Sequence, residues 1–306
     1  MHHQLSEGLA KRLVVDWGSS NFRAFRFGPR GEILERHQAD AGILNVPDGA
    51  FEHVLLREIG NWIDGETEIL LSGMITSRNG WVETPYLEAP ATLEGLRAAA
   101  LERRIDCGAR LMFLPGVCNR QPQPDVMRGE EIQVFGSVAE QEDALVVLPG
   151  THSKWVDVSN GAIAGFTTFL TGEMFALLRQ HSIIGRLIPP GPAAQSAEAF
   201  LRGVFAGYDE NPRGLLNLVF TARAGALLGE FEPGDIAERL SGILIGHEIR
   251  SGLASGRHRD MPARLIGEAA LLARYKAAFD ALGLSCEMGP DHAAVAGFRR
   301  LGVLGG

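Results

Sequence analysis

The chain has few cysteines, no long apolar run and no excess of basic residues. Its three cysteines, Cys107, Cys118 and Cys286, are odd in number and lack CxxC spacing, which argues against a disulfide framework or a zinc site and favours a reducing compartment. No apolar stretch approaches the roughly 18 residues that a membrane-spanning helix needs, and the first apolar run is interrupted at Asp16. We therefore expect a cytoplasmic protein with no membrane partner.

Positive charge is scarce. The chain has 29 Lys and Arg against 37 Asp and Glu, a net charge of −8, which argues against sequence-independent binding of nucleic acid. Its 306 residues leave room for two domains at roughly 150 residues each. Apolar residues at 45% and charged residues at 22% are typical of a globular protein. The oligomeric state does not follow from composition.

Two passages share one plan, once in each half of the chain. RLVVDWGSSNFRAFRFGPRGEILERHQ (12–38) and ALVVLPGTHSKWVDVSNGAIAGFTTFL (144–170) each read as three strands joined by tight turns, with Gly18 and Ser19 matching Gly150 and Thr151. Chance similarity of two hairpins is the alternative. Strand and helix patterns alternate between the passages, with one helix expected over 93–103. We therefore predict an α/β fold of two similar domains, 1–125 and 126–306, whose first hairpin turns face a shared interdomain cleft.

The first hairpin turn has the composition of a phosphate-binding element. Asp16 ends an apolar strand, and the Gly-Ser-Ser turn that follows offers backbone N–H groups and hydroxyls to phosphate oxygens. A carboxylate at this place can hold Mg²⁺, usually through water. The predicted ATP ligands here are Gly18, Ser19, Ser20 and Arg23. The alternative is a tight hairpin whose polar groups only satisfy the backbone.

The second turn, in LPGTHSKWV, is its counterpart. Gly150 permits close approach of a ligand, and donors follow it in Thr151, His152, Ser153 and Lys154. The GxxxxGK[ST] pattern of a P-loop is absent, and a plain hairpin is again the alternative. We predict Gly150, Thr151, Ser153 and Lys154 as further ATP ligands.

The passage MRGEEIQVFGSV places Glu130 and Glu131 at the start of a predicted helix. One of them can take the proton from an attacking hydroxyl, and we favour Glu130 as this catalytic base. Asp16, which can hold Mg²⁺, is the second predicted catalytic residue. Acidic residues also stabilise helix starts through the helix dipole, which is the alternative for each glutamate.

Two loops have the polar composition of a small-polyol site. SGMITSRNGWVETPYLE follows a predicted strand, and in it Arg78 can form a bidentate pair with a carboxylate. Met74, Ser77 and Asn79 accompany it, and Asn45 in AGILNV is compatible with the same pocket. The alternative is an ordinary surface loop with Arg78 in water.

The stretch RLIGEAALLARYKAAFDALGL (264–284) reads as a strand, a turn at Gly267 and an amphipathic helix. Such a turn can seat an adenine ring against the helix start, although an ordinary strand–helix unit has the same pattern.

Taken together, these stretches resemble the 2-dehydro-3-deoxygalactonokinase family, a branch of the sugar kinase and actin-like ATPase superfamily. The resemblance runs from Val14 to about Leu301, and its most specific stretches are DWGSSNFRAF, SGMITSRNGW, MRGEE, LPGTHSKWV, TGEMFALLRQHSI and IGEAALLARY. It implies two ribonuclease-H-like (actin-like ATPase) domains around an interdomain active site, ATP with Mg²⁺ as cofactor, and phosphorylation of a 2-keto-3-deoxy sugar acid at its 6-hydroxyl.

The resemblance also implies roles for single residues. Asp16 would organise Mg²⁺, with Gly18, Ser19 and Ser20 at the phosphates. The second phosphate loop would consist of Gly150, Thr151 and Ser153. Gly267 would be the glycine of the adenosine motif. Related sugar kinases place an Asp where this chain has Glu130, and often a second glycine where it has Glu268. The alternatives are a kinase for another sugar acid, such as the gluconate epimer, and a non-catalytic ATP- or sugar-sensing protein or an assembling ATPase of the same fold.

Overall fold

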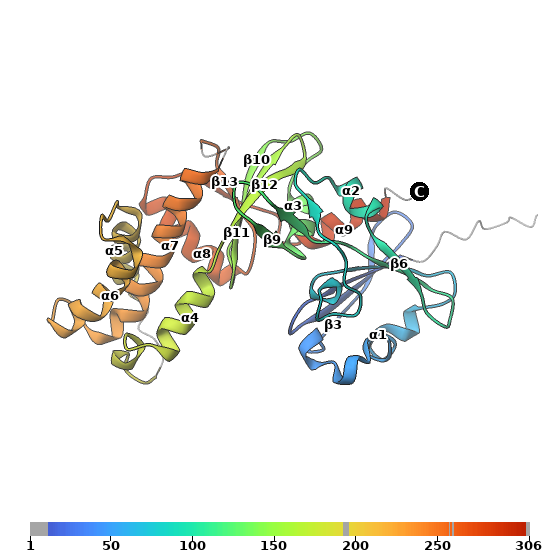
Figure 1. The fold of residues 1–306 in the computed structure, drawn as a ribbon, viewed down its shortest axis with the longest axis horizontal. Helices are drawn as coiled ribbons and strands as arrows, with labels where there is room; N and C mark the ends of the chain where they lie inside the picture. Colours follow the sequence, from blue (N-terminus) through green and yellow to red (C-terminus); the bar gives the residue numbers. More distant parts are fainter. Residues whose placement is uncertain (1–11, 192–195, 257, 259, 304–306) are drawn as a thin grey trace, which may run out of the picture. The chain divides into compact units, whose positions relative to one another are not determined.

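The computed structural model describes residues 12–191, 196–256, 258 and 260–303. Within them the chain divides into two compact units, and Figure 1 labels the helices and several of the strands. The first unit extends to Glu140 and also takes in Gly161–Ile163 and the chain from His292. The second unit comprises Gln141–Asn160 and Ala164–Asp291.

The first unit is built on a six-stranded sheet with the order β3-β2-β1-β4-β7-β6. The strands are β1 (Arg12–Trp17), β2 (Phe22–Phe27), β3 (Ile33–Ala39), β4 (Glu68–Ser72), β6 (Leu101–Arg104) and β7 (Arg110–Phe113). β1, β2 and β3 form an antiparallel meander, and β4 and β7 continue from β1 in parallel. Every residue of β4 is buried, as expected of a central strand covered on both faces.

The second unit repeats this arrangement in a five-stranded sheet with the order β12-β11-β10-β13-β14. The strands are β10 (Ala144–Leu148), β11 (Ser153–Ser159), β12 (Ala162–Phe169), β13 (Ala263–Leu265) and β14 (Cys286–Met288). β10 pairs antiparallel with β11 and parallel with β13, as β1 does with β2 and β4. This shared strand order confirms the predicted α/β class with two ribonuclease-H-like units. A small third sheet, β5-β8-β9, consists of Leu87–Glu88, Val117–Asn119 and Asp125–Met127.

Helices complete each unit. The first has α1 (Phe51–Ile59), α2 (Leu93–Ala98), α3 (Glu130–Ser137) and α9 (Ala293–Val303), and the second has α4 (Thr171–His181), α5 (Ala197–Tyr208), α6 (Gly214–Leu227), α7 (Ile236–Ser255) and α8 (Ala269–Ala281). Figure 1 shows α4, α5 and α6 gathered around α7. The helix expected over 93–103 ends at Ala98 because the chain turns there and adds β6 to the edge of the sheet.

The packing of the last helix, α9, decides which residues belong to the first unit. α9 packs on α3 so closely that a Cβ on Gly136 would lie 1.8 Å from Ala293 O, and Arg300 donates a hydrogen bond to Val138 O at 2.7 Å. Residues 126–140 and the C-terminal segment therefore belong with the first sheet, whereas the sequence placed the boundary at residue 125.

Each sheet encloses an apolar core. In the first unit Leu13, Val15 and Trp17 of β1 are fully buried, and the Trp17 indole donates to Ala41 O at 2.7 Å. In the second unit the core contains Leu145 and Val147 with side chains from α7 and α8. Across the described part of the chain, no helix has the length and apolar character of a membrane span.

Candidate active site

Asp16 lies near the end of β1, beside the hairpin turn that leads into β2. The Arg23 guanidinium donates to Asp16 Oδ2 at 2.6 Å, and 17% of the Asp16 side chain is exposed. Burial raises the pKa of this carboxyl, Arg23 opposes the shift, and the charge of Glu130 adds to it. Carboxylate and serine oxygens are the hard donors that Mg²⁺ prefers, and Mg²⁺ commonly needs only one or two carboxylates besides water and substrate phosphates. The residues at this turn therefore fit the ion.

The turn itself is held by the loop at 41–46. N–H groups of residues 42–44 donate to the carbonyl oxygens of Ser20, Gly18 and Ser19, in that order, at 3.0–3.1 Å. A Cβ on Gly42 would lie 2.3 Å from Ser19 O, so this contact requires glycine. Among the described residues, the N–H groups of Ser19 and Ser20 have no hydrogen-bond acceptor. The turn is thus a braced loop with backbone donors available to an anion.

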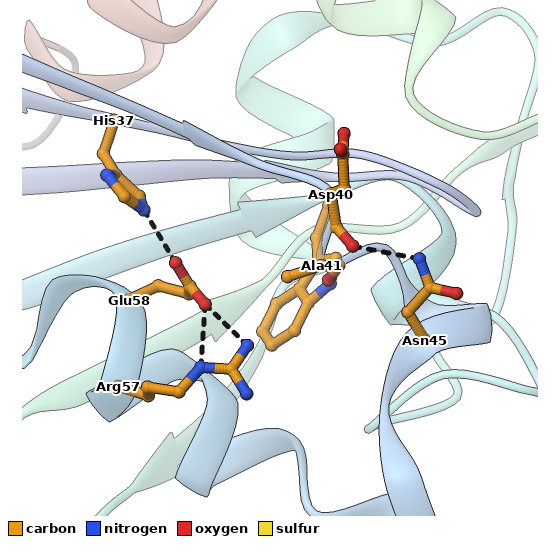
Figure 2. A network of polar contacts seen from close by, with 7 residues as sticks. His37, Asp40, Ala41, Asn45, Arg57 and Glu58 are labelled. Atoms are coloured by element: carbon orange, nitrogen blue, oxygen red, sulfur yellow. Dashed lines mark hydrogen bonds and ion pairs between the residues drawn. The ribbon is translucent and has the colours of Figure 1, made fainter.

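Asn45, predicted to contact the substrate, is exposed at the end of this loop. Its side-chain nitrogen donates to Asp40 O at 2.9 Å, and Figure 2 shows its oxygen pointing away from that contact. On the other side of Figure 2, Glu58 of α1 holds His37 of β3 at 2.8 Å. The loop that follows β3 therefore starts from a strand tied to α1, and Asn45 retains an acceptor for a ligand hydroxyl.

Two glycines allow the segment before α3 to reach the end of β1. Gly73 follows β4 with φ +91°, and a Cβ there would lie 2.9 Å from Trp17 O and 3.3 Å from Asp16 Oδ1. Gly129 has φ +106°, and its Cβ would lie 3.3 Å from Gly73 Cα. These backbone approaches bring Glu130, the first residue of α3, near Asp16.

The two adjacent glutamates occupy different environments. Glu130 is half-buried, and its Oε2 accepts a hydrogen bond from Arg128 N at 3.0 Å. Glu131 is 1% exposed and accepts from Gly129 N at 2.7 Å and from Ser72 Oγ at 3.4 Å. Burial, with the nearby charge of Glu130, raises the pKa of Glu131 to about 8. Glu131 is therefore mainly protonated at neutral pH, and Glu130 is the carboxyl with access to solvent.

Arg128 is a site residue that the sequence reading missed. Its Nη1 donates to Thr76 O at 2.7 Å, to Thr76 Oγ1 at 2.6 Å and to Thr84 Oγ1 at 2.7 Å, and its guanidinium lies 4.3 Å from the centre of the Tyr86 ring. These contacts join the segment before α3 to the loop after β4. The available signal was an arginine directly before Gly129, but its partners lie 44 and 52 residues away.

The loop after β4 carries the predicted substrate residues. Ser77 Oγ donates to Met74 O at 2.7 Å, which closes the 3₁₀ turn η4 (Met74–Thr76). Arg78 and Asn79 are exposed, and within the described residues neither has a hydrogen-bond or ion-pair partner. A guanidinium without a protein partner is available to a carboxylate.

The second hairpin turn joins β10 to β11, and only its first residues are accessible to solvent. Gly150 has free space at its Cβ position, and Thr151 and His152 are exposed. Ser153 and Lys154 are buried, at 0% and 4% exposed, and Lys154 Nζ donates to His152 O at 3.1 Å. Of the four ATP ligands predicted here, Gly150 and Thr151 are accessible, whereas the side chains of Ser153 and Lys154 lie in the interior.

A buried polar network supports this turn. Glu248 of α7 accepts hydrogen bonds from Trp155 Nε1 at 2.8 Å and Tyr275 Oη at 2.7 Å. Tyr275 Oη lies 3.1 Å from Ser153 Oγ, which accepts a longer bond of 3.4 Å from Gly150 N. Burial raises the pKa of the Glu248 carboxyl, and its hydrogen bonds oppose that shift. Ser153 therefore links the turn to a buried carboxyl.

Gly267 lies beside the same turn. It follows β13 with φ +156°, and a Cβ there would lie 3.3 Å from Pro149 O. The next residue, Glu268, caps α8 by accepting hydrogen bonds from Ala270 N and Leu271 N, both at 3.1 Å. The structure thus brings Gly267 next to Pro149, the residue before Gly150, in the second unit, as it brings Glu130 near Asp16 in the first.

Comparison with known proteins agrees with these features. The model of the 2-keto-3-deoxy-galactonokinase family matches residues 16–301. The 2-dehydro-3-deoxygalactonokinase of Escherichia coli (strain K12) is 36% identical over 290 residues, 94% of each chain. A protein of Rhizobium meliloti (strain 1021) named as a probable 2-dehydro-3-deoxygalactonokinase is 34% identical over 278 residues, 89% of this chain and 90% of its own.

Structural comparison extends the agreement to the fold. The crystal structure of a protein from Sinorhizobium meliloti, which carries the same name provisionally, superposes with a TM-score of 0.86 at 34% identity and covers 95% of this chain and 97% of its own. Both relatives and the family model span nearly the whole chain. The chain therefore belongs to the 2-keto-3-deoxy-galactonokinase family of kinases.

Proposed function

We propose that this enzyme transfers the γ-phosphoryl group of ATP to the 6-hydroxyl of 2-dehydro-3-deoxy-D-galactonate, giving 2-dehydro-3-deoxy-6-phosphogalactonate in the breakdown of galactonate and galactose. The proposal rests on one observation above all, the approach of Glu130 to Asp16 through Gly73 and Gly129. Phosphoryl transfer needs a group that orients the attacking hydroxyl close to the group that organises the metal and phosphates. The named relatives support the choice of acceptor.

In this mechanism Glu130 accepts the proton of the sugar 6-hydroxyl as its oxygen attacks the γ-phosphorus. The bond between the γ-phosphorus and the β,γ-bridging oxygen breaks, and ADP leaves. Asp16 would hold the Mg²⁺ of the ATP complex, and the ion would neutralise phosphate charge. The N–H groups of Ser19 and Ser20 supply further donors. Glu131 is mainly protonated and buried and so is poorly suited to accept a proton, which leaves the solvent-accessible Glu130 to serve as the base.

The acceptor is bound, in this proposal, by the loops after β3 and β4. Arg78 pairs with the sugar-acid carboxylate, because its guanidinium is exposed and has no partner among the described residues. Ser77, Asn79 and Asn45 face the hydroxyl groups, and Met74 supplies an apolar contact. Bidentate pairing would select an acid over a neutral hexose.

The second unit contributes to the donor. Gly150 and Thr151 contact the phosphates, Gly267 lies under the adenosine, and Ser153 and Lys154 maintain the turn from the interior. Arg23 holds Asp16 in place and can donate to a phosphate if that ion pair opens. Since ATP and Mg²⁺ are its co-substrates, we place the reaction in the cytoplasm.

A coupled assay of ADP release tests the proposal across 2-dehydro-3-deoxygalactonate, its gluconate epimer, galactonate and common hexoses. We expect a strong preference for the first. Glu130→Gln should lower kcat by about 10²- to 10⁴-fold with KM for the sugar acid little changed, the range for losing a general base. Glu131→Gln is the matched control and should stay within about tenfold of wild type, because it replaces a carboxyl that is already neutral.

Three results would contradict parts of this assignment. Full turnover by Glu130→Gln would remove its role as base, and preference for the epimer would replace the acceptor. If ATP binds and no substrate turns over, the protein is a non-catalytic sensor of ATP or sugar.

A further inference from the structure

The first unit contains a cavity of about 370 Å³ at the end of the sheet opposite Asp16. Arg12, Glu68 and Arg110 are the first residues of β1, β4 and β7, and they form one row across these parallel strands. Asp16 lies four residues further along β1, a separation of about 13 Å. The cavity is lined by Arg12, Gly65, Glu66, Thr67, Glu68, Arg97, Arg104 and Arg110. It is therefore a separate place from the candidate active site.

The lining is positively charged although the protein is acidic. Four arginines face two glutamates, which leaves two positive charges in excess within a chain of net charge −8. Glu102 lies outside the lining, with Oε1 3.7 Å from Arg104 Nη2 and 3.9 Å from Arg110 Nε. Both are ion-pair distances beyond hydrogen-bond length, so one positive charge remains in excess when Glu102 is counted with the lining.

The guanidinium groups of Arg97, Arg104 and Arg110 have more donors than the described residues supply with acceptors. Glu68 forms ion pairs with both Arg110 and Arg97, the second at 3.5 Å. Arg97 also donates to Leu301 O at 2.6 Å, and Arg104 donates to Gly108 O at 3.0 Å. Arg110 Nε is buried and has no hydrogen-bond partner among the described residues. Since each guanidinium carries five N–H donors, these three arginines retain donors for which the described residues supply no acceptor oxygen.

We propose that this cavity binds a small polyanion, whose phosphoryl or carboxylate groups carry at least two negative charges. Such groups match arginine in charge and in the spacing of paired oxygens. The volume lies in the usual range for small-molecule sites, roughly 300 to 1,000 Å³. A bound anion would join the edge strand β6, through Arg104, to the starts of β1 and β7, and it would stabilise the first unit by mass action.

Titration calorimetry with pyrophosphate and with citrate tests this site, with chloride at equal ionic strength as the blank. The test variant is Arg104→Gln, whose side chain is 61% exposed, so its loss does not disturb the core. Arg103→Gln is the matched control, because Arg103 is exposed on the same strand and does not line the cavity. We expect Arg104→Gln to weaken binding by about tenfold or more, the loss of a charged hydrogen bond, and Arg103→Gln to change it less than twofold.

The two probes separate the possible ligands, because tighter binding of pyrophosphate indicates a phosphate ester and tighter binding of citrate a polycarboxylate. Binding should also persist with saturating ATP present. Equal weakening by both variants would mean that only the overall charge attracts the anion, and displacement of the probe by ATP would place it at the phosphate turns. Either result, or no binding above the chloride blank, overturns the proposal, and none of them bears on the kinase reaction.

Discussion

Replacing Glu131 by glutamine should change how the stability of the protein depends on pH. Burial raises the pKa of Glu131 from an ordinary 4.5 to about 8, so the folded protein keeps this proton over a range in which the unfolded chain loses it. Above pH 4.5 the unfolded state therefore binds fewer protons than the folded state, and the free energy of unfolding falls as the pH rises. The fall continues until the folded carboxyl itself ionises near pH 8, and then it levels off.

The size of the effect follows from the two pKa values. Over the whole range the loss is roughly 4 to 5 kcal/mol, at about 1.4 kcal/mol for each pKa unit. Between pH 6 and pH 8 the same relation gives a loss of about 2 kcal/mol. The side chain is 1% exposed, so solvent screening reduces this figure little. Glu131→Gln does not titrate, and its stability should lack this component.

Urea unfolding at pH 6 and pH 8 measures the difference, with tryptophan fluorescence as the signal. Three of the four tryptophans, Trp17, Trp62 and Trp81, belong to the first unit. The free energy of unfolding of Glu131→Gln minus that of wild type should rise by about 2 kcal/mol between the two pH values, while the exposed-site control Glu140→Gln should show no such rise. A difference for Glu131→Gln that stays constant to about 0.5 kcal/mol would refute the assignment of a buried neutral carboxyl.

Two further substitutions test how the loops around Asp16 are held. Arg128→Met removes the hydrogen bonds to the loop after β4 and should lower the free energy of unfolding, measured by calorimetry, by about 2 to 4 kcal/mol. The control is Arg120→Met, which removes an ion pair whose arginine side chain is 73% exposed. It should change the free energy of unfolding by less than about 1 kcal/mol. Gly42→Ala places a Cβ 2.3 Å from Ser19 O of the first hairpin turn, so it should raise KM for ATP and lower the free energy of unfolding by about 1 to 3 kcal/mol. The control Gly60→Ala has room for its Cβ and should change neither quantity. Wild-type KM in Gly42→Ala would contradict the link between the loop and the phosphate site.

Much of the fold was predictable because it depends on local signals. Apolar runs ended by Asp16 and Gly150, with turn residues after them, correctly predicted two meanders, and their repetition predicted two units of one topology. The helix at 93–103 was wrong in its second half, since the edge strand β6 forms by pairing with β7, which its own sequence does not reveal. α6 was not predicted, and its apolar residues are distributed around the helix without one clear face.

The sequence by itself determined which chemical groups are present and roughly where along the chain they occur: a carboxylate before a small-residue turn, two glutamates at a helix start, and a polar loop that contains Arg78. Only the tertiary structure decided which of them are accessible. Burial separates Glu131 from Glu130 and Ser153 from Thr151, although each pair is adjacent or nearly so in sequence. The tertiary structure also brought Arg12, Arg97 and Arg110, from three distant segments of the chain, into the lining of one cavity. The physical reason is that exposure and pKa depend on packing between elements far apart in the chain, whereas turn and strand preferences depend on neighbouring residues.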